Sequence, residues 1–225
     1  MKLPEIAGVK LSRTLPTAAH WEHHLLLELP APCETVSSAP LGGGFGERRV
    51  IVNRSVHKDW GCADPHGDMR RYAQRLGLPA EHTVGLVTAV GMADLRYAAG
   101  ARSGWRVHTL LTAGVGNAAA AGGRFPLDRP ETHAGTVNLI VLIEGYLSPP
   151  ALVGAVQSAT EAKAAALRAA RVTTRFGEAA TGTTTDTVTV VNLAPAPRSP
   201  YAGLATAPGY LVADTVYKAL SAALS

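Results

Sequence analysis

The segment Val137–Ile143 reads VNLIVLI, and this nearly continuous apolar run constrains the fold more than any other part of the chain. A run of this length predicts a β-strand buried on both faces, because a strand with one face in water would alternate apolar and polar residues. Such a strand needs a packed layer on each side. We therefore expect a layered fold with this strand inside it.

Other segments have the apolar and β-branched composition of strands. Strands are predicted at His24–Leu29, Thr35–Ala39, Arg48–Val56, Thr83–Val90, Arg106–Ala113, Thr136–Ile143 and Thr187–Leu193. Helices are predicted from Asp64-Pro65 to Gly77, from Ser148-Pro149 to about Ala170, and from Pro208-Gly209 to the C-terminus, because capping residues and prolines mark their starts.

The order of these elements indicates the fold class. Strands dominate the first half and do not alternate strictly with helices. This pattern favours an α+β fold, a single layered domain over residues 1–225 with a mixed or largely antiparallel sheet and flanking helices. A doubly wound parallel sheet is the alternative.

Composition excludes several classes of protein. The chain of 225 residues is 47% hydrophobic and 17% charged, which is typical of a globular protein. The net charge is +4, and the basic residues form no dense stripe along the sequence, so we expect no nucleic-acid partner. Cys33 and Cys62 form no CxxC pair and predict neither a zinc site nor a disulfide. The sequence has neither a secretory signal nor an apolar stretch of about 18 residues, so we expect a cytoplasmic protein with no membrane span. A twofold homodimer is the default expectation for its assembly.

The predicted long helix carries the sequence Thr160-Glu161-Ala162-Lys163. On a helical wheel Lys163 shares an apolar face with Leu152 and Leu167, with Thr160 close by, whereas Glu161 points toward the border of that face. A lysine there either extends its ammonium to the edge or has a partner in a pocket. The residues alone leave both interpretations open.

A polar turn precedes the last predicted strand. It consists of Thr181, Gly182, Thr183, Thr184, Thr185 and Asp186, and its backbone N–H groups can form an anion-binding nest. Asp186 is a candidate to orient a threonine hydroxyl, to act as a base or to cap the turn. By composition alone, an ordinary threonine-rich strand edge is the favoured explanation of the segment.

Glycine-rich loops follow or precede other strands. The first contains Thr112, Gly114, Gly116 and Asn117, and lacks the third glycine of a dinucleotide fingerprint and the GK[ST] ending of a phosphate loop. The second contains Gly43 and Gly44, ahead of the strand that carries Asn53. Glycines at a strand end allow close approach of a ligand, although most glycine runs are only turns.

Histidines give no clear site. The segment His20-Trp21-Glu22-His23-His24 is not HExxH, so a surface histidine cluster is favoured over a metal site. Each of His57, His66, His82, His108 and His133 is a possible general base, but no spacing selects one. The sequence has no GxSxG nucleophile elbow.

Taken in order, the motifs resemble the CbiZ family over roughly residues 35 to 220. The resemblance rests on Gly43-Gly44, Asn53, Thr88-Ala89, Thr112–Ala118, Thr136-Val137-Asn138, Thr160–Lys163, Ala180–Asp186 and Tyr201–Gly203. It implies hydrolysis of the aminopropanol amide of adenosylcobinamide, which gives adenosylcobyric acid and 1-amino-2-propanol in corrinoid salvage or remodelling. The substrate brings its own cobalt, and neither a cofactor nor a protein-bound metal is expected.

The chemistry of the residues in these motifs suggests candidates for the site of this activity. Glu161, Lys163 and Asp186 are the expected catalytic residues, since amide hydrolysis needs a base, a proton donor and oxyanion stabilisation. Substrate binding is assigned to Gly43, Gly44, Asn53, Thr112, Gly114, Gly116, Asn117, Asn138, Thr160, Thr181, Gly182, Thr183 and Thr185.

Three alternatives remain. The same loops could bind a corrinoid without cutting it, or belong to a phosphate-handling enzyme such as a kinase, which the missing phosphate loop disfavours. Alternatively, the chain could cut itself at Ala180-Thr181 to free an N-terminal threonine, a disfavoured variant that a single intact species in active enzyme would exclude.

Overall fold

The computed structural model describes residues 2–17, 22–124 and 135–225. Within this part of the chain, eight strands form one sheet in the order β4-β3-β2-β11-β8-β6-β5, with β1 paired to β2. These strands are β1 (Lys10–Arg13), β2 (His23–Ser37), β3 (Gly44–Ser55), β4 (Thr83–Thr88), β5 (Arg96–Arg102), β6 (Trp105–Ala113), β8 (Val137–Glu144) and β11 (Thr187–Asn192). Pairs β3–β4 and β8–β11 are parallel and the other neighbours are antiparallel, so the predicted mixed sheet is confirmed and the doubly wound alternative is wrong.

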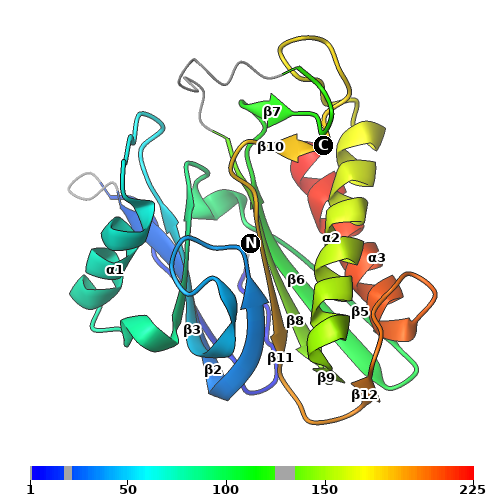
Figure 1. The fold of residues 1–225 in the computed structure, drawn as a ribbon. Coiled ribbons are helices and arrows are strands. Elements are labelled where there is room, and N and C mark those ends of the chain that lie inside the picture. Colours follow the sequence, from blue (N-terminus) through cyan, green and yellow to red (C-terminus); the bar gives the residue numbers. More distant parts are fainter. Residues whose placement is uncertain (1, 18–21, 125–134) are drawn as a thin grey trace.

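The sheet folds over on itself along β2. This strand pairs with β3 for most of its length, but with β11 only through Thr35, Val36 and Ser37. One half of the sheet therefore contains β1 to β4 and the other contains β11, β8, β6 and β5, and the two halves face each other at an angle (Figure 1). Buried side chains of both halves pack between them, including Leu27 and Ile140.

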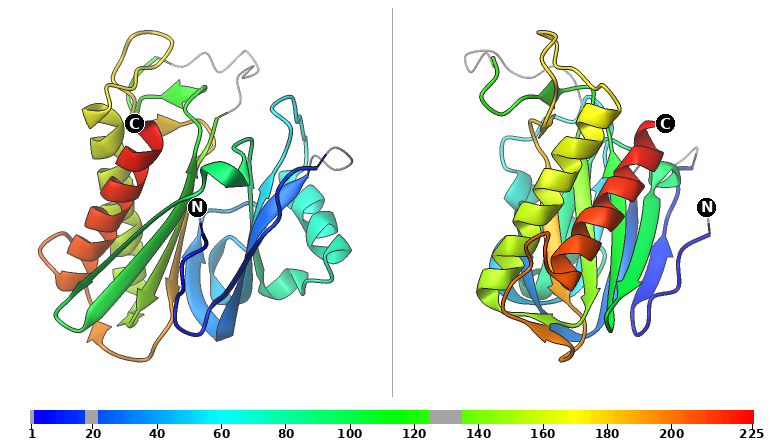
Figure 2. Two further views of the ribbon diagram at one scale, coloured as in Figure 1. Left: turned by 180° about the vertical axis from the view of Figure 1, so that it is seen from behind. Right: turned by 90° about the vertical axis from the view of Figure 1, so that its right-hand side faces the viewer.

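Helices cover the outer faces of the folded sheet. Helices α2 (Pro149–Ala169) and α3 (Ala207–Leu224) lie side by side on the half that contains β8, and α1 (Pro65–Arg75) lies on the half that contains β3 and β4 (Figures 1 and 2). Strand β8 is thus covered on both sides. Its alternate residues Leu139, Val141 and Ile143 face the α2–α3 layer, whereas Ile140 and Leu142 face the other half of the sheet. The prediction for this apolar run is confirmed.

Short elements complete the chain. Two small two-stranded sheets pair β10 (Gly182–Thr183) with β7 (Ala118–Ala119) and β12 (Arg198–Ser199) with β9 (Tyr146–Leu147). Short 3₁₀ helices form at Ala80–His82 and Met92–Asp94. The pairing of β10 with β7 brings the threonine-rich turn beside the glycine loop that follows β6.

The predicted starts of α1 and α2 are confirmed, whereas α3 begins at Ala207, just before the predicted Pro208-Gly209. Asp64 accepts a hydrogen bond from Gly67 N at 2.8 Å, Ser148 caps α2, and Thr206 caps α3 by accepting from Gly209 N at 3.1 Å. None of the helices in the described residues is long and apolar enough to cross a membrane.

Strands β1, β2 and β5 of the main sheet differ from the sequence prediction, which had no strand at β1. His24–Leu29 and Thr35–Ala39 are parts of the single strand β2, because its register shifts between Glu28 and Cys33 and so accommodates the prolines between them. Strand β5 was not predicted, since its sequence RYAAGAR is poor in β-branched residues. The hairpin with β6 holds it in place.

Candidate active site

A buried ion pair joins α2 to the threonine-rich turn. Lys163 Nζ donates to Asp186 Oδ2, and each side chain is only 9% exposed. The lysine on the apolar face of α2 therefore has a partner in a pocket and does not extend to the edge. A charged pair enclosed this far needs further hydrogen bonds to offset the loss of hydration.

Asp186 receives those hydrogen bonds. Its Oδ1 accepts from Val137 N at 2.9 Å and from Thr183 Oγ1 at 2.5 Å, and its Oδ2 accepts from Thr183 N at 3.0 Å in addition to Lys163 Nζ. One carboxylate thus connects the turn, the start of β8 and helix α2. Asp186 therefore holds a threonine hydroxyl and the backbone of the turn, and its part in catalysis stays a prediction.

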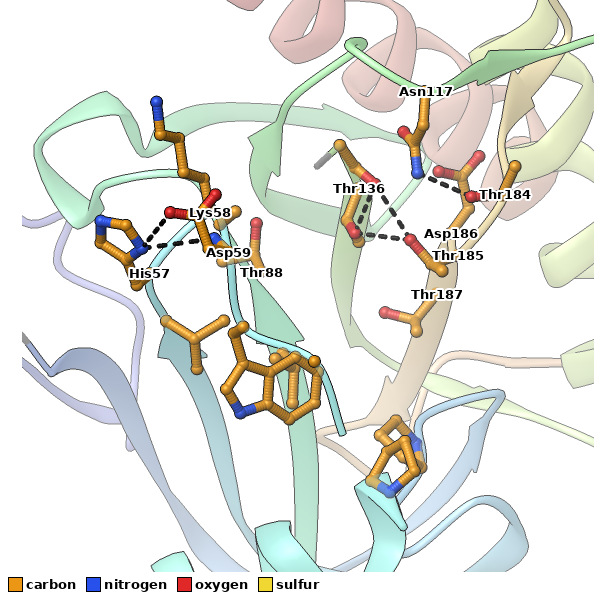
Figure 3. Close-up of a pocket in the computed structure, with 18 of the residues that line it drawn as sticks. His57, Lys58, Asp59, Thr88, Asn117, Thr136, Thr184, Thr185, Asp186 and Thr187 are labelled. Carbon is orange, nitrogen blue, oxygen red and sulfur yellow. Dashed lines mark hydrogen bonds and ion pairs between the residues drawn. The ribbon is translucent and has the colours of Figure 1, made fainter. Parts of the chain in front are cut away.

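A cavity of about 650 Å³ opens beside this carboxylate, between the two halves of the sheet (Figure 3). One wall comes from the threonine-rich turn, the glycine loop and the start of β8. The facing wall comes from the ends of β3 and β4 and the loop after β3. The two walls are lined by Ser38, Pro40, Val56, His57, Lys58, Asp59, Trp60, Gly61, Pro65, Val87, Thr88, Ala89, Asn117, Gly135, Thr136, Thr184, Thr185, Asp186 and Thr187.

The first wall carries hydroxyl and amide groups. Thr136 Oγ1 and Thr185 Oγ1 lie 2.7 Å apart, and Asn117 Nδ2 donates to Thr184 Oγ1 at 2.6 Å (Figure 3). Asn117 is 6% exposed, and its Oδ1 has no hydrogen-bond partner within the described residues. An unpaired buried acceptor of this kind is unusual and is typical of a functional site.

Gly135 packs closely against this wall. Thr185 Oγ1 donates to Gly135 O at 3.0 Å, and Thr136 Oγ1 lies 2.7 Å from the same oxygen. A Cβ atom at position 135 would clash with Asn117 Oδ1 and lie 2.9 Å from both Gly114 O and Gly116 N. Only glycine fits here without movement of the loop.

The sequence prediction of the site did not include Thr136, whereas the hydroxyls of Thr183 to Thr185 were expected to hold the substrate. Thr136 directly precedes the buried strand and belongs to a motif that carries the family resemblance. A threonine that follows a glycine at the start of a buried strand was the sequence signal that could have identified Thr136 as a site residue.

The facing wall is partly apolar. Val56, Trp60, Val87 and Ala89 contribute apolar surface, and the imidazole of His57 pairs with Asp59 at 3.2 Å between Nδ1 and Oδ2 (Figure 3). A cavity with one hydrogen-bonding wall and one apolar wall suits an organic ligand that carries an amide.

Asn53, Thr112 and Asn138, which were predicted to bind substrate, form a buried network with Thr187. Asn53 Nδ2 donates to Thr112 Oγ1 at 3.1 Å, Asn138 Nδ2 donates to Asn53 Oδ1 at 2.9 Å, and Thr187 Oγ1 donates to Asn138 Oδ1 at 2.7 Å. The asparagines and Thr112 are at most 1% exposed. The network joins β3, β6, β8 and β11 and supports the cavity wall on which Thr187 lies.

We expect the Asn53→Leu variant to lose about 2–3 kcal/mol of unfolding free energy, because the partners in this network are left unpaired and buried. Urea denaturation measures the loss. Gln74→Leu is the matched control, since Gln74 is an exposed amide on α1 and its replacement should change stability by less than about 0.5 kcal/mol. Equal stability of both variants would contradict a structural role for the network.

Other predicted site residues lie outside this cavity. Thr160, Glu161, Thr181, Gly182 and Thr183 line a second cavity of about 730 Å³ on the other side of the turn, together with Lys163. The Lys163–Asp186 pair therefore lies between the two cavities. Glu161 is exposed, so a catalytic role for it in the first cavity stays a prediction.

The glycines that were predicted to bind substrate do not all lie at the first cavity. Gly43 lines a third cavity with His66 and Arg70, and Gly44 adopts a positive φ of 79° beside it in the chain. Gly114 and Gly116 lie next to Gly135 and so support the first cavity from behind.

The N-terminal histidines do not form a surface cluster, so that prediction is wrong. His23 is 1% exposed and its Nε2 accepts from Met92 N at 3.1 Å, because alternate residues of β2 face the core. His24 Nδ1 lies 2.8 Å from the Tyr72 hydroxyl, and burial, with His23 nearby, lowers the pKa of His24.

Glu22 and the described histidines belong to no group of metal-binding side chains. Glu22 forms ion pairs with Arg54 and Arg75. His20 and His133 lie outside the described residues, and no group of three or more metal-binding side chains occurs among the residues that are described.

Comparisons with known proteins identify the chain's relatives. Residues 9–225 match the family CbiZ, adenosylcobinamide amidohydrolase. The adenosylcobinamide amidohydrolase of Methanosarcina mazei is 30% identical over 200 residues, which cover 85% of this chain and 90% of that protein. The adenosylcobinamide amidohydrolase of Halobacterium salinarum is 33% identical over 208 residues, which cover 90% of this chain and 85% of that protein.

Among solved structures, a Burkholderia sp. beta-aminopeptidase has a similar fold, with a TM-score of 0.52 and 12% identity over 97% of this chain and 84% of that chain. At this identity the likeness concerns the fold alone. The match over residues 9–225 and the two relatives confirm the resemblance inferred from the motifs: the chain belongs to the CbiZ family of adenosylcobinamide amidohydrolases.

Proposed function

We propose that the cavity between the two halves of the sheet hydrolyses the amide that joins aminopropanol to a propionate arm of adenosylcobinamide, giving adenosylcobyric acid and 1-amino-2-propanol. The observation that carries the proposal is the wall on which Asn117, Thr136, Thr184, Thr185 and Asp186 converge from three separate segments. Amide hydrolysis needs a nucleophile, hydrogen-bond donors for the carbonyl oxygen and control of proton transfer, and this wall offers groups of the required kinds.

Cavity size indicates how such a substrate binds. A volume of about 650 Å³ is in the range of pockets for drug-sized ligands, whereas a corrin ring with its side arms is larger. We propose that the amide arm enters the cavity and that the ring rests at the mouth near Trp60. The cobalt enters as part of the substrate.

The Lys163–Asp186 ion pair contributes to this reaction by positioning other parts of the site. Asp186 holds the start of β8 and the threonine-rich turn in register, and Lys163 keeps that carboxylate in place. Lys163 also puts a positive charge behind the wall where negative charge develops on the carbonyl oxygen. Glu161 faces the second cavity, and its catalytic role stays a prediction. The homodimeric assembly also stays a prediction.

The test is incubation of the purified protein with adenosylcobinamide, without nucleotide, followed by chromatography with mass detection. We expect adenosylcobyric acid and free aminopropanol. Unchanged substrate that co-elutes with the protein would instead indicate a corrinoid-binding module. A product that forms only with added nucleotide would indicate a phosphate-handling enzyme.

We expect the Trp60→Ala variant to raise KM for adenosylcobinamide roughly tenfold with little change in kcat, because Trp60 offers apolar surface to the substrate away from the reacting bond. Steady-state kinetics separate the two constants. Phe45→Ala is the matched control, since Phe45 is an aromatic residue that is 54% exposed and lines none of the three cavities. A fall in kcat at unchanged KM would contradict this role.

A further inference from the structure

We propose that Thr136 Oγ1 is the nucleophile, and that the chain frees the α-amine of Thr136 by cutting its own Gly135–Thr136 peptide bond. The substrate in this assignment rests on the proposed function, whereas the cleavage itself does not. Three oxygen atoms in the first wall of the cavity support this assignment.

These atoms form a triangle. Thr136 Oγ1 lies 2.7 Å from Gly135 O and 2.7 Å from Thr185 Oγ1, and Thr185 Oγ1 donates to Gly135 O at 3.0 Å. A hydroxyl has a single proton to donate. When Thr185 donates to Gly135 O, Thr136 can donate to Thr185, so a continuous path leads from the Thr136 hydroxyl to the carbonyl oxygen of the preceding peptide.

Among the described residues of the intact chain, no basic group contacts the Thr136 hydroxyl. It is 7% exposed, and its hydrogen-bond partners among the described residues are a hydroxyl and a carbonyl oxygen, neither of which removes a proton near neutral pH. Asp186 already accepts four hydrogen bonds. A threonine hydroxyl is a weak nucleophile without a base, and the α-amine of an N-terminal threonine is one group that activates it.

Cleavage supplies that amine in balanced steps. Thr136 Oγ1 attacks the carbonyl carbon of Gly135, and the hydroxyl proton passes through Thr185 to the carbonyl oxygen. The C–N bond of the tetrahedral intermediate then breaks while the proton on its hydroxyl passes to the departing nitrogen, which leaves an ester between Gly135 and Thr136 Oγ1 and a free α-amine on Thr136. Water hydrolyses the ester to the Gly135 carboxylate and the Thr136 hydroxyl.

The same atoms then act on the substrate. The α-amine takes the Oγ1 proton while Oγ1 attacks the amide carbon of the substrate, and the leaving 1-amino-2-propanol takes that proton as the C–N bond breaks. The resulting ester between the corrinoid acid and Thr136 is hydrolysed by water, which restores the hydroxyl. One amide and one water are consumed in each turnover.

The surroundings hold this peptide bond in place. Gly135 packs against Asn117 and the glycine loop with no room for a Cβ atom, and Val137 N donates to Asp186 on the other side of Thr136. Asn117 Oδ1, buried and without a partner in the described chain, lies against Gly135 and offers an unused acceptor beside the bond that is cut.

Thr181, the alternative cleavage position in the sequence, lacks this arrangement. Its Oγ1 accepts from Ala121 N at 2.9 Å, its backbone N donates to Ala119 O at 2.9 Å, and it lines the second cavity. The Thr181 hydroxyl is thus held by a different loop, and the geometry favours cleavage before Thr136.

The first experiment is intact-mass spectrometry of the purified wild-type chain under denaturing conditions, with N-terminal sequencing. We expect two fragments, residues 1–135 and 136–225, whose masses together exceed that of the intact chain by one water, and a new N-terminus at Thr136. A single intact species near 23.3 kDa that turns over adenosylcobinamide would overturn the proposal.

Variants test the nucleophile itself. Thr136→Val should stay intact and lose roughly 10³-fold or more of kcat, whereas Thr136→Ser should retain both cleavage and turnover, because it keeps the hydroxyl. Thr173→Ala, an exposed threonine that lines none of the three cavities, is the matched control and should behave as wild type. A Thr136→Val chain that is active would overturn the assignment, and the wild-type masses and Thr136→Ser remain decisive if Thr136→Val does not fold.

The outcomes separate this inference from the proposed function. Cleavage before Thr136 without turnover of adenosylcobinamide would support the reactive threonine and contradict the proposed substrate. Turnover without cleavage would support the substrate and overturn the inference.

Discussion

The Gly135→Ala variant should lose about 100-fold or more of its turnover of adenosylcobinamide. The added Cβ atom would collide with Asn117 Oδ1 and approach Gly114 O and Gly116 N to 2.9 Å, so the glycine loop and the start of β8 must separate. This movement displaces Thr136 and Asn117 within the cavity wall, and displacements of about 1 Å are known to cost catalysis on this scale. Steady-state kinetics give the turnover, and urea denaturation should show a loss of about 1–3 kcal/mol from the overpacking.

Gly203→Ala is the matched control for this substitution. A Cβ atom at Gly203 would meet no atom within 4 Å, and its φ is not in the left-handed region, so both activity and stability should stay close to wild type. A Gly135→Ala variant with wild-type turnover would show that the close packing at Gly135 does not position the reacting groups.

The Lys163→Met variant should lose about 3–5 kcal/mol of unfolding free energy, because it leaves the Asp186 carboxylate buried without its cationic partner. Turnover should also fall, since Asp186 connects the threonine-rich turn to Val137 N, next to Thr136. Urea denaturation and steady-state kinetics measure the two effects. Methionine keeps most of the length of the lysine side chain, so the loss reports on the charge more than on packing.

An exposed ion pair provides the comparison. Lys218 donates to Asp214 at 2.7 Å, but Lys218 is 61% exposed, so Lys218→Met should leave the unfolding free energy close to that of wild type. The double variant Lys163→Met/Asp186→Asn should be destabilised by less than the sum of its single variants, because neither charge is then left alone. Equal effects of Lys163→Met and Lys218→Met would contradict the importance of burial for the first pair.

The structure separates the expected catalytic residues into different positions. Asp186 faces the first cavity, Lys163 lies behind it, and Glu161 opens to the second cavity. Helix geometry placed Lys163 and Glu161 on different faces of α2, but it gave no partner for either. The partner of Lys163 is 23 residues away in the sequence, and only the packing of α2 on the sheet brings the two together.

Local signals account for the elements that were predicted. Helix caps such as Asp64 and Ser148 satisfy the first backbone N–H groups within a few residues, so they can be recognised in the sequence. The apolar run of β8 required burial on both faces wherever the strand lay in the fold. Strand β5 was missed because its pairing with β6 outweighs its weak intrinsic preference.

The sequence by itself determined the α+β class, the helix starts, the doubly buried strand and, through the order of its motifs, the family. Only the tertiary structure decided that Asn53 and Asn138 support the site from within the protein, and that Thr136, Asn117 and the threonine-rich turn share one cavity wall. The physical reason is that a cap or an apolar run acts over a few neighbouring residues. The cavity instead depends on segments far apart in the chain, which the pairing of β8 with β11 and the fold of the sheet along β2 bring into contact.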